Sequence, residues 1–250
     1  MELDIGWTLV LFIAVGFGAQ IVDGALGMAY GLVSTSVLLA MGVPPAQASA
    51  SVHAAEMVTT GISGSAHAWF GNVDRRLLRR LALPGMLGGV TGALIAARIP
   101  SDWLKPLVLV YLLVMGLFVL WRAWRRVISQ RDPRAVPAIG LVAGFLDAIG
   151  GGGWGPMATS TLLAQGNPPR YTVGSVNAAE FFVTTAITIA FVGAMGFDFG
   201  VVTLGLLLGG GAAAPFAAWA VRHIPQRGLL LIVGTLILTI AIVQLALLAR

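Results

Sequence analysis

The sequence predicts an all-α integral membrane protein built from two inverted repeats, each of about five hydrophobic segments with a glycine-broken helical hairpin. Composition is the first reason: 58% of the 250 residues are hydrophobic and 10% are charged, whereas about a quarter of a soluble domain is charged. Long apolar runs recur along the whole chain, and the mean hydropathy is +0.91. The third reason is that the second half of the chain repeats much of the first.

Other protein classes fit this composition poorly. The apolar content excludes a disordered chain, and the absence of cysteine excludes a disulfide scaffold. The net charge of +5 does not indicate nucleic-acid binding, because the bases stand in short gaps between apolar runs. Residues 1–4 lack the basic region of a signal peptide, so we expect the mature protein to keep the first apolar run.

The apolar runs define the expected helices in chain order. A helix needs about 20 residues to cross the hydrocarbon core of a membrane. Most runs approach that length, but 28–41, 136–150 and 153–165 are too short to span it with ease. The runs lie at residues 6–22, 28–41, 46–70, 81–98, 104–124, 136–150, 153–165, 172–195, 199–221 and 228–248.

The two halves of the chain are related by an offset of 124 residues. Residues 23–60 align with residues 147–184 without a gap, and 17 of the 38 positions are identical. The polar segment 122–134 separates the halves. We therefore expect two transmembrane repeats, residues 1–130 and residues 131–250, that together form one membrane domain.

Positive charge sets the expected orientation, because cytoplasmic loops of membrane proteins collect Lys and Arg. If each repeat crosses the membrane an odd number of times, the repeats are inverted and twelve of the fifteen bases lie on one side. If each short pair of runs counts as one crossing, the repeats run parallel and the division is ten to five. The inverted arrangement fits better, and it places both chain ends outside the cytoplasm.

Each half has a glycine-rich break next to an acidic residue, VDGALGMAYG at 22–31 and LDAIGGGGWG at 146–155. Short broken segments at matching places in two halves point to the binding site of a transporter. A helix that restarts after such a break directs its free N–H groups toward an anion. The alternative is a tight hairpin whose glycines only allow close helix packing. The first interpretation assigns substrate binding to Gly27, Gly31, Gly151, Gly152 and Gly155.

The third run of each half has polar residues on one helical face, near the expected middle of the membrane. His53 and Glu56 share a face in the first half, and Asn177 and Glu180 take the same positions in the second. We expect His53 and Asn177 to coordinate the oxygens of an oxyanion, with packing as the alternative role. Hydroxyl groups complete the predicted substrate site, namely those of Thr35, Ser51, Thr159 and Ser175.

Four of the ten acidic residues lie inside apolar segments, and these are Asp23, Glu56, Asp147 and Glu180. An ionised carboxylate there costs several kcal/mol, so such residues mark ion paths, proton relays or paired groups. For Glu56 and Glu180, proton coupling and bracing of the opposite hairpin both remain open. For Asp23 and Asp147, the alternative to a coupling role is to cap the restarting helix.

Motifs of other chemistry are absent from the sequence. It has no Walker A pattern, no HExxH, no Cys/His cluster and no GxSxG in a credible context. GGGGWG is not a dinucleotide fingerprint, because no soluble βαβ unit surrounds it. We therefore predict that the protein is not an enzyme and that it holds no metal and no cofactor.

Both halves carry a glycine-rich break, then a Pro-Pro turn, then SVHAAE in the first half and SVNAAE in the second. This doubled pattern resembles the TauE/SafE sulfite exporter family, small bacterial permeases for sulfur-containing anions, and the resemblance covers nearly the whole chain. It implies export of sulfite, or of a related organosulfur anion such as sulfoacetate, across the bacterial inner membrane. The sulfur-containing substrate rests on the resemblance alone.

Together these expectations describe a multi-pass secondary transporter of the bacterial inner membrane that exports a small sulfite-like anion by alternating access. Protons are the expected coupling ion and the lipid bilayer is the surrounding partner. A homodimer is a further candidate, and no nucleic acid is expected. An anion channel is the main alternative and needs a continuous polar path. An intramembrane enzyme, which would modify its substrate, is the less favoured one.

Overall fold

The computed structural model describes residues 5–124, 135–196, 200–223 and 226–249, and within these ranges every regular element is a helix. The prediction of an all-helical chain is confirmed. In chain order the elements are α1 (Ile5–Leu26), α2 (Tyr30–Ala40), α3 (Pro45–Trp69), α4 (Arg75–Ala96), α5 (Ser101–Arg122), α6 (Val136–Gly150), a π-helical turn (Gly155–Thr159), α7 (Ser160–Ala164), α8 (Pro169–Met195), α9 (Val201–His223) and α10 (Gln226–Leu248).

Four of these helices have the length and apolar composition of membrane spans. They lie at Ile5–Asp23, Ser101–Arg122, Pro169–Met195 and Arg227–Leu248. Three further apolar helices are shorter, at Tyr30–Ala40, Val136–Gly150 and Val201–Ala214. The first two of these, with 11 and 15 residues, correspond to runs that the sequence predicts to be too short for a full crossing.

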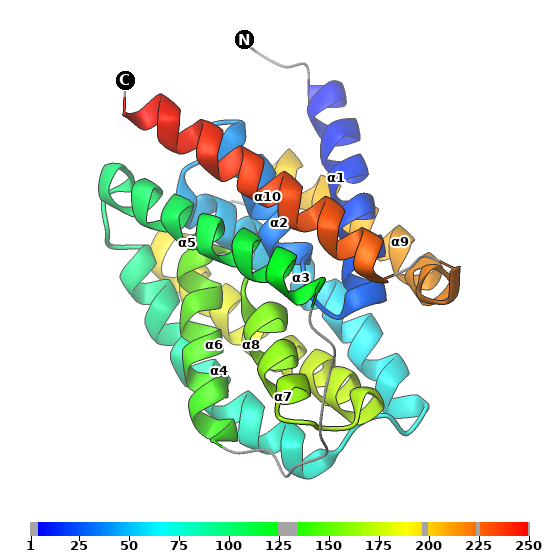
Figure 1. Cartoon of the computed structure of the whole chain (residues 1–250). Helices are drawn as coiled ribbons and strands as arrows, with labels where there is room; N and C mark the ends of the chain where they lie inside the picture. The colour runs from blue at the N-terminus through cyan, green and yellow to red at the C-terminus, as the bar shows by residue number, and fades with distance from the viewer. Residues whose placement is uncertain (1–4, 125–134, 197–199, 224–225, 250) are drawn as a thin grey trace.

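The helices of the two halves exchange partners rather than forming two separate bundles. The first helix of each half packs along the fourth helix of the other, so α1 lies beside α9 and α6 lies beside α4 (Figure 1). Close contact at small residues permits this packing. A Cβ on Gly16 of α1 would lie 2.5 Å from the carbonyl oxygen of Leu206, and a Cβ on Gly140 of α6 would lie 2.6 Å from that of Leu81.

Two pairs of matching helices pack against each other in opposite directions. In the pair α3 and α8, Gly64 lies against Ala178 whereas Gly61 lies against Phe181, so the two helices are antiparallel. The pair α5 and α10 is also antiparallel and its helices run side by side (Figure 1). Because α3 and α8 carry the polar faces that the sequence singles out, their contact places these faces inside the molecule.

Both helix breaks occur at the glycines where the sequence predicts them. α1 ends at Leu26 and α6 ends at Gly150, and the chain turns at Gly27 and Gly151, whose φ angles are +64° and +68°. Glycine adopts this left-handed conformation without the steric cost that a Cβ would add. After the second break the chain restarts as a single π-helical turn, which the sequence pattern does not predict.

Candidate functional site

The two glycine breaks, one from each half, touch in the middle of the molecule. A Cβ on Gly31 would lie 2.6 Å from the Cα of Gly152, and a Cβ on Gly155 would lie 2.7 Å from the carbonyl oxygen of Gly27. These distances leave no room for a side chain at either contact. Close packing between the breaks is therefore part of what their glycines do, as the alternative interpretation of the sequence proposes.

Two hydroxyl groups tie the breaks together in matching ways. Thr35 Oγ1 of the first half donates a hydrogen bond to the carbonyl oxygen of Gly151. Thr159 Oγ1 of the second half donates to the carbonyl oxygen of Gly27 at 3.3 Å. Both threonines are completely or almost completely buried. The predicted site residues Thr35 and Thr159 thus lie at the breaks, where each one bonds to the opposite half.

The acidic residue before each break caps the helix that follows the break. Asp23 Oδ1 accepts a hydrogen bond from the N–H of Tyr30 at 3.3 Å, and Asp147 Oδ1 accepts one from the N–H of Trp154 at 2.9 Å. A carboxylate suits this position because the start of a helix carries partial positive charge. An anion that binds these N–H groups would have to displace the two side chains.

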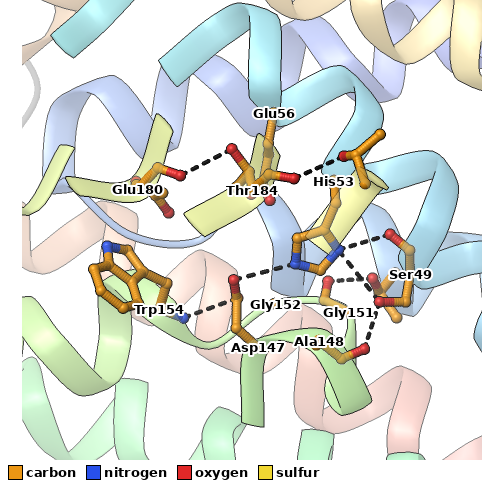
Figure 2. A network of polar contacts seen from close by, with 12 residues as sticks. Ser49, His53, Glu56, Asp147, Ala148, Gly151, Gly152, Trp154, Glu180 and Thr184 are labelled. Carbon is orange, nitrogen blue, oxygen red and sulfur yellow. Dashed lines mark hydrogen bonds and ion pairs between the residues drawn. The ribbon is translucent and has the colours of Figure 1, made fainter. Parts of the chain in front are cut away.

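His53 links α3 of the first half to α6 of the second half. Its Nε2 lies 3.1 Å from Asp147 Oδ2 and its Nδ1 lies 2.7 Å from the carbonyl oxygen of Ser49. The Ser49 hydroxyl in turn donates to the carbonyl oxygen of Ala148 at 2.6 Å. Figure 2 shows the imidazole ring between Ser49 and Asp147. Among the described residues, His53 and Asp147 are the one basic and acidic pair of side chains within ion-pair distance, and both are buried.

Asn177 repeats half of this arrangement. Its Nδ2 donates to the carbonyl oxygen of Val173, four residues earlier, at 3.1 Å. His53 makes the same backward contact with Ser49. The other end of Asn177 differs, because its Oδ1 accepts a hydrogen bond from Ser63 Oγ at 3.3 Å. His53 and Asn177 therefore sit at matching positions but share no hydrogen-bond partner.

Glu56 and Glu180 lie on α3 and α8 and are almost completely buried. Glu56 Oε1 faces the first break, 3.2 Å from the place that a Cβ on Gly31 would take. Its Oε2 has no hydrogen-bond partner among the described residues. Glu56, Glu180, Asp23 and Asp147 lie close enough that the ionisation of one acid affects the others, so the four acids form a single cluster.

The serines of the predicted substrate site lie apart from this cluster. Ser51 lines a cavity of about 310 Å³ between the start of α3 and the end of α8, together with Gln47 and Thr188. Ser175 is buried at the other end of the α3–α8 pair, where its Oγ accepts a hydrogen bond from the N–H of Asp74 at 2.9 Å. A substrate role for these two serines stays a prediction.

The two ends of the α3–α8 pair differ in their polar contacts. At the start of α8, Arg170 Nε donates to Asn72 Oδ1 at 2.5 Å and Nη2 donates to the carbonyl oxygen of Phe70 at 3.0 Å. Gly174 packs on the backbone of Asn72, where a Cβ would meet the carbonyl oxygen at 2.2 Å. These contacts fasten α8 to the turn between α3 and α4. The cavity beside Ser51 occupies the opposite end, and a second cavity of about 300 Å³ lies beside the fastened end.

The structure adds residues that the sequence pattern does not single out. Ser49 precedes His53 by one helical turn, so the spacing of four residues is a signal that could have found it. Tyr111 of α5 donates to the carbonyl oxygen of Gly152 at 2.7 Å. Nothing in its apolar run distinguishes Tyr111. Within the described part of the chain, no group of three or more His, Asp or Glu side chains could hold a metal ion.

Comparisons with known proteins place the chain among membrane transporters. The family model described as "Sulfite exporter TauE/SafE" matches residues 12–243. The probable membrane transporter protein YtnM of Bacillus subtilis (strain 168) is 42% identical over 241 residues, which cover 92% of this chain and 80% of that protein. No solved structure matches.

Proposed function

This chain belongs to the TauE/SafE sulfite exporter family, and we propose that it is a secondary transporter that exports sulfite or a related small organosulfur anion across the inner membrane by alternating access. One observation carries the proposal. Two broken helices, one from each half, meet at the centre of a membrane protein beside a buried polar cluster. Matching broken helices of this kind build the substrate sites of many secondary transporters.

The proposed architecture is a pair of inverted repeats, residues 1–130 and residues 131–250, in one membrane domain. Its support is the antiparallel packing of matching helices in the pairs α3 and α8, and α5 and α10. Helices related by a parallel duplication would run in the same direction. The positive-inside rule then assigns the start of α4 and the start of α8, with their arginines, to the cytoplasmic side.

The proposed anion site lies where the two breaks face α3 and α8. Its ligands would be backbone N–H groups at the helix restarts, with the side chains of His53 and Asn177. Asp23 and Asp147 now accept hydrogen bonds from those N–H groups, so an arriving anion takes a place that a carboxylate already fits. Glu56 Oε2 has no hydrogen-bond partner among the described residues, so the proposed site holds one further polar atom that is not yet satisfied.

The unequal ends of the α3–α8 pair support alternating access. Arg170 and Asn72 fasten one end, and this end is cytoplasmic in the proposed orientation. A cavity lined by Gln47, Ser51 and Thr188 hollows the other end. Thr188 stands one helical turn from Thr184, which itself stands one turn from Glu180. We interpret this arrangement as a state in which the cavity beside Ser51 faces outward and the contacts of Arg170 hold the cytoplasmic end together.

Counterflow in proteoliposomes tests the function. Vesicles that contain the purified protein and unlabelled sulfite are diluted into radiolabelled sulfite, and a panel of sulfoacetate, sulfate, phosphate and chloride replaces the internal anion in turn. We expect saturable uptake with sulfite or sulfoacetate inside. Uptake that rises linearly with concentration would identify a channel, and recovery of a chemically altered anion would identify an enzyme. The absence of saturable exchange with every sulfur anion would refute the proposal.

A further inference from the structure

The geometry points to a proton-binding site formed by His53 and Asp147, in which one proton shared between Nε2 and Oδ2 is exchanged during each transport cycle. This inference rests on the proposed transport function and identifies the residues of the coupling site. It assigns coupling to a pair that joins the two halves, whereas Glu56 and Glu180 are the proton carriers that the sequence alone indicates.

The hydrogen on the other ring nitrogen is fixed by its partners. A carbonyl oxygen only accepts hydrogen bonds, so the 2.7 Å contact between His53 Nδ1 and the carbonyl oxygen of Ser49 requires a hydrogen on Nδ1. The Ser49 hydroxyl directs its own hydrogen to Ala148. Its oxygen, 3.2 Å from Nδ1, is therefore a second acceptor. Both acceptors, the Ser49 carbonyl oxygen and the Ser49 hydroxyl oxygen, therefore hold the proton on Nδ1.

The proton between His53 Nε2 and Asp147 Oδ2 can be exchanged. These atoms lie 3.1 Å apart, and two bare acceptors at that distance would repel each other, so one proton lies between them. The pair is an imidazolium with a carboxylate, or an imidazole with a carboxylic acid, and both forms are neutral overall. With side-chain exposures of 0% and 3%, the pair can gain or lose a proton only if another charge compensates.

The groups around the pair indicate that the transported anion supplies the compensating charge. The acids that act on Asp147 come from α1, α3 and α8, namely Asp23, Glu56 and Glu180, and the Tyr111 hydroxyl of α5 faces it as well. Among the described residues, no Lys or Arg forms an ion pair with Asp147. An anion that enters this buried surrounding, where Asp147 has no basic partner other than His53 among the described residues, is strongly disfavoured unless a proton enters with it.

In the second half of the chain, Asn177 takes the position of His53, so the matching site has no group there that can gain or lose a proton. Asn177 keeps the backward hydrogen bond to the helix backbone, at 3.1 Å, but an amide does not titrate. The duplication therefore provides one histidine–aspartate pair and not two. It also supplies the test variant, because His53→Asn places in the first half the residue that the second half already accommodates.

Proton-driven accumulation tests the inference. Purified protein in liposomes, with the membrane potential clamped at zero, is given a gradient of one pH unit, and labelled sulfite uptake is corrected with protein-free liposomes. We expect the wild type to accumulate sulfite about tenfold on the alkaline side, the value for one proton per anion. In the cell, a sulfite dianion with one proton carries net negative charge, so the inside-negative membrane potential drives its export. We expect His53→Asn to lose this accumulation. His67→Asn, the same change on the same helix away from the pair, is expected to keep it.

Two results would overturn the inference: wild-type counterflow that proceeds without any pH-driven accumulation, or His53→Asn protein that still accumulates sulfite tenfold. If His53→Asn fails to insert in the membrane, proton uptake by the wild type decides instead. A pH dye inside the vesicles should then report one proton for each sulfite, and sulfite entry without a pH change would refute the site. Absence of counterflow in the wild type would instead refute the proposed function itself, so the two failures are distinguishable.

Discussion

Thr159 donates a hydrogen bond to the carbonyl oxygen of Gly27, 132 residues earlier in the chain. Thr35 makes the corresponding bond to Gly151. The two threonines are equivalent in the duplicated sequence, and so are the two glycines. Each half therefore supplies a threonine that positions the glycine break of the other half. The first break is positioned by a residue of the second repeat, and the second break by a residue of the first.

Loss of either threonine hydroxyl should weaken this connection. Thr35→Val and Thr159→Val each leave a buried carbonyl oxygen without its hydrogen bond, so we expect each to destabilise the protein by about 1–2 kcal/mol. Thermal unfolding of the purified variants in detergent measures the effect. Thr91→Val is the matched control, because the exposed Thr91 hydroxyl bonds only to the backbone of its own helix. Equal melting temperatures for all three variants would contradict the interpretation.

A methyl group at the contact between the breaks should prevent their close approach. A Cβ on Gly152 would lie 2.3 Å from the backbone of Gly31 and Leu32, and the φ of Gly152 is +154°. We expect Gly152→Ala to abolish folding or transport, as measured by size-exclusion profile and counterflow. Gly193→Ala is the control, since nothing lies within 4 Å of a Cβ there. Wild-type behaviour of Gly152→Ala would show that the breaks can separate without loss.

Ala29 is held in a backbone conformation that disfavours its side chain. Its φ is +124°, and the matching position of the second break is Gly153. Strain of this kind costs about 1–3 kcal/mol, and glycine relieves it. We expect Ala29→Gly to raise the melting temperature by a few degrees, as measured in the same detergent. A lower melting temperature would indicate that the methyl group contributes packing that outweighs the strain.

The contacts of Arg170 should hold one end of the molecule closed. Because the chain has no cysteine, single cysteines at Ser175 and Gln47 can report each end without background labelling. We expect Arg170→Ala to speed thiol labelling at position 175 by about fivefold, which corresponds to about 1 kcal/mol. Labelling at position 47 should slow as the cavity closes. Unchanged rates at both positions would refute the role of Arg170 in closure.

The duplication made much of the site predictable from the sequence. Two glycine breaks and two acidic positions at the same offset predict that helices break at Gly27 and Gly151, and they do. The capping role of Asp23 and Asp147 was one of two interpretations, because a hydrogen bond to an N–H seven residues later depends on how the chain turns back. Local sequence does not specify that path.

A single sequence does not predict which residues of distant segments contact each other. His53 and Asp147 are 94 residues apart, and Arg170 and Asn72 are 98 apart. Each pair forms because helices of the two halves pack together, and a hydropathy pattern predicts which residues are buried but not which buried residues meet. Tyr111 is the clearest example, because its hydroxyl donates to the carbonyl oxygen of Gly152 from a helix whose sequence predicts only a membrane span.

The exchange of partners between the halves also constrains how the protein is made. α1 is synthesised long before α9, the helix that covers it, and α4 must wait for α6. Chains fold from the N-terminus as they leave the ribosome, so the first half enters the membrane with its contact surfaces open to lipid. The contacts of α9 with α1 and of α10 with α5 can therefore form only after most of the second half has been inserted.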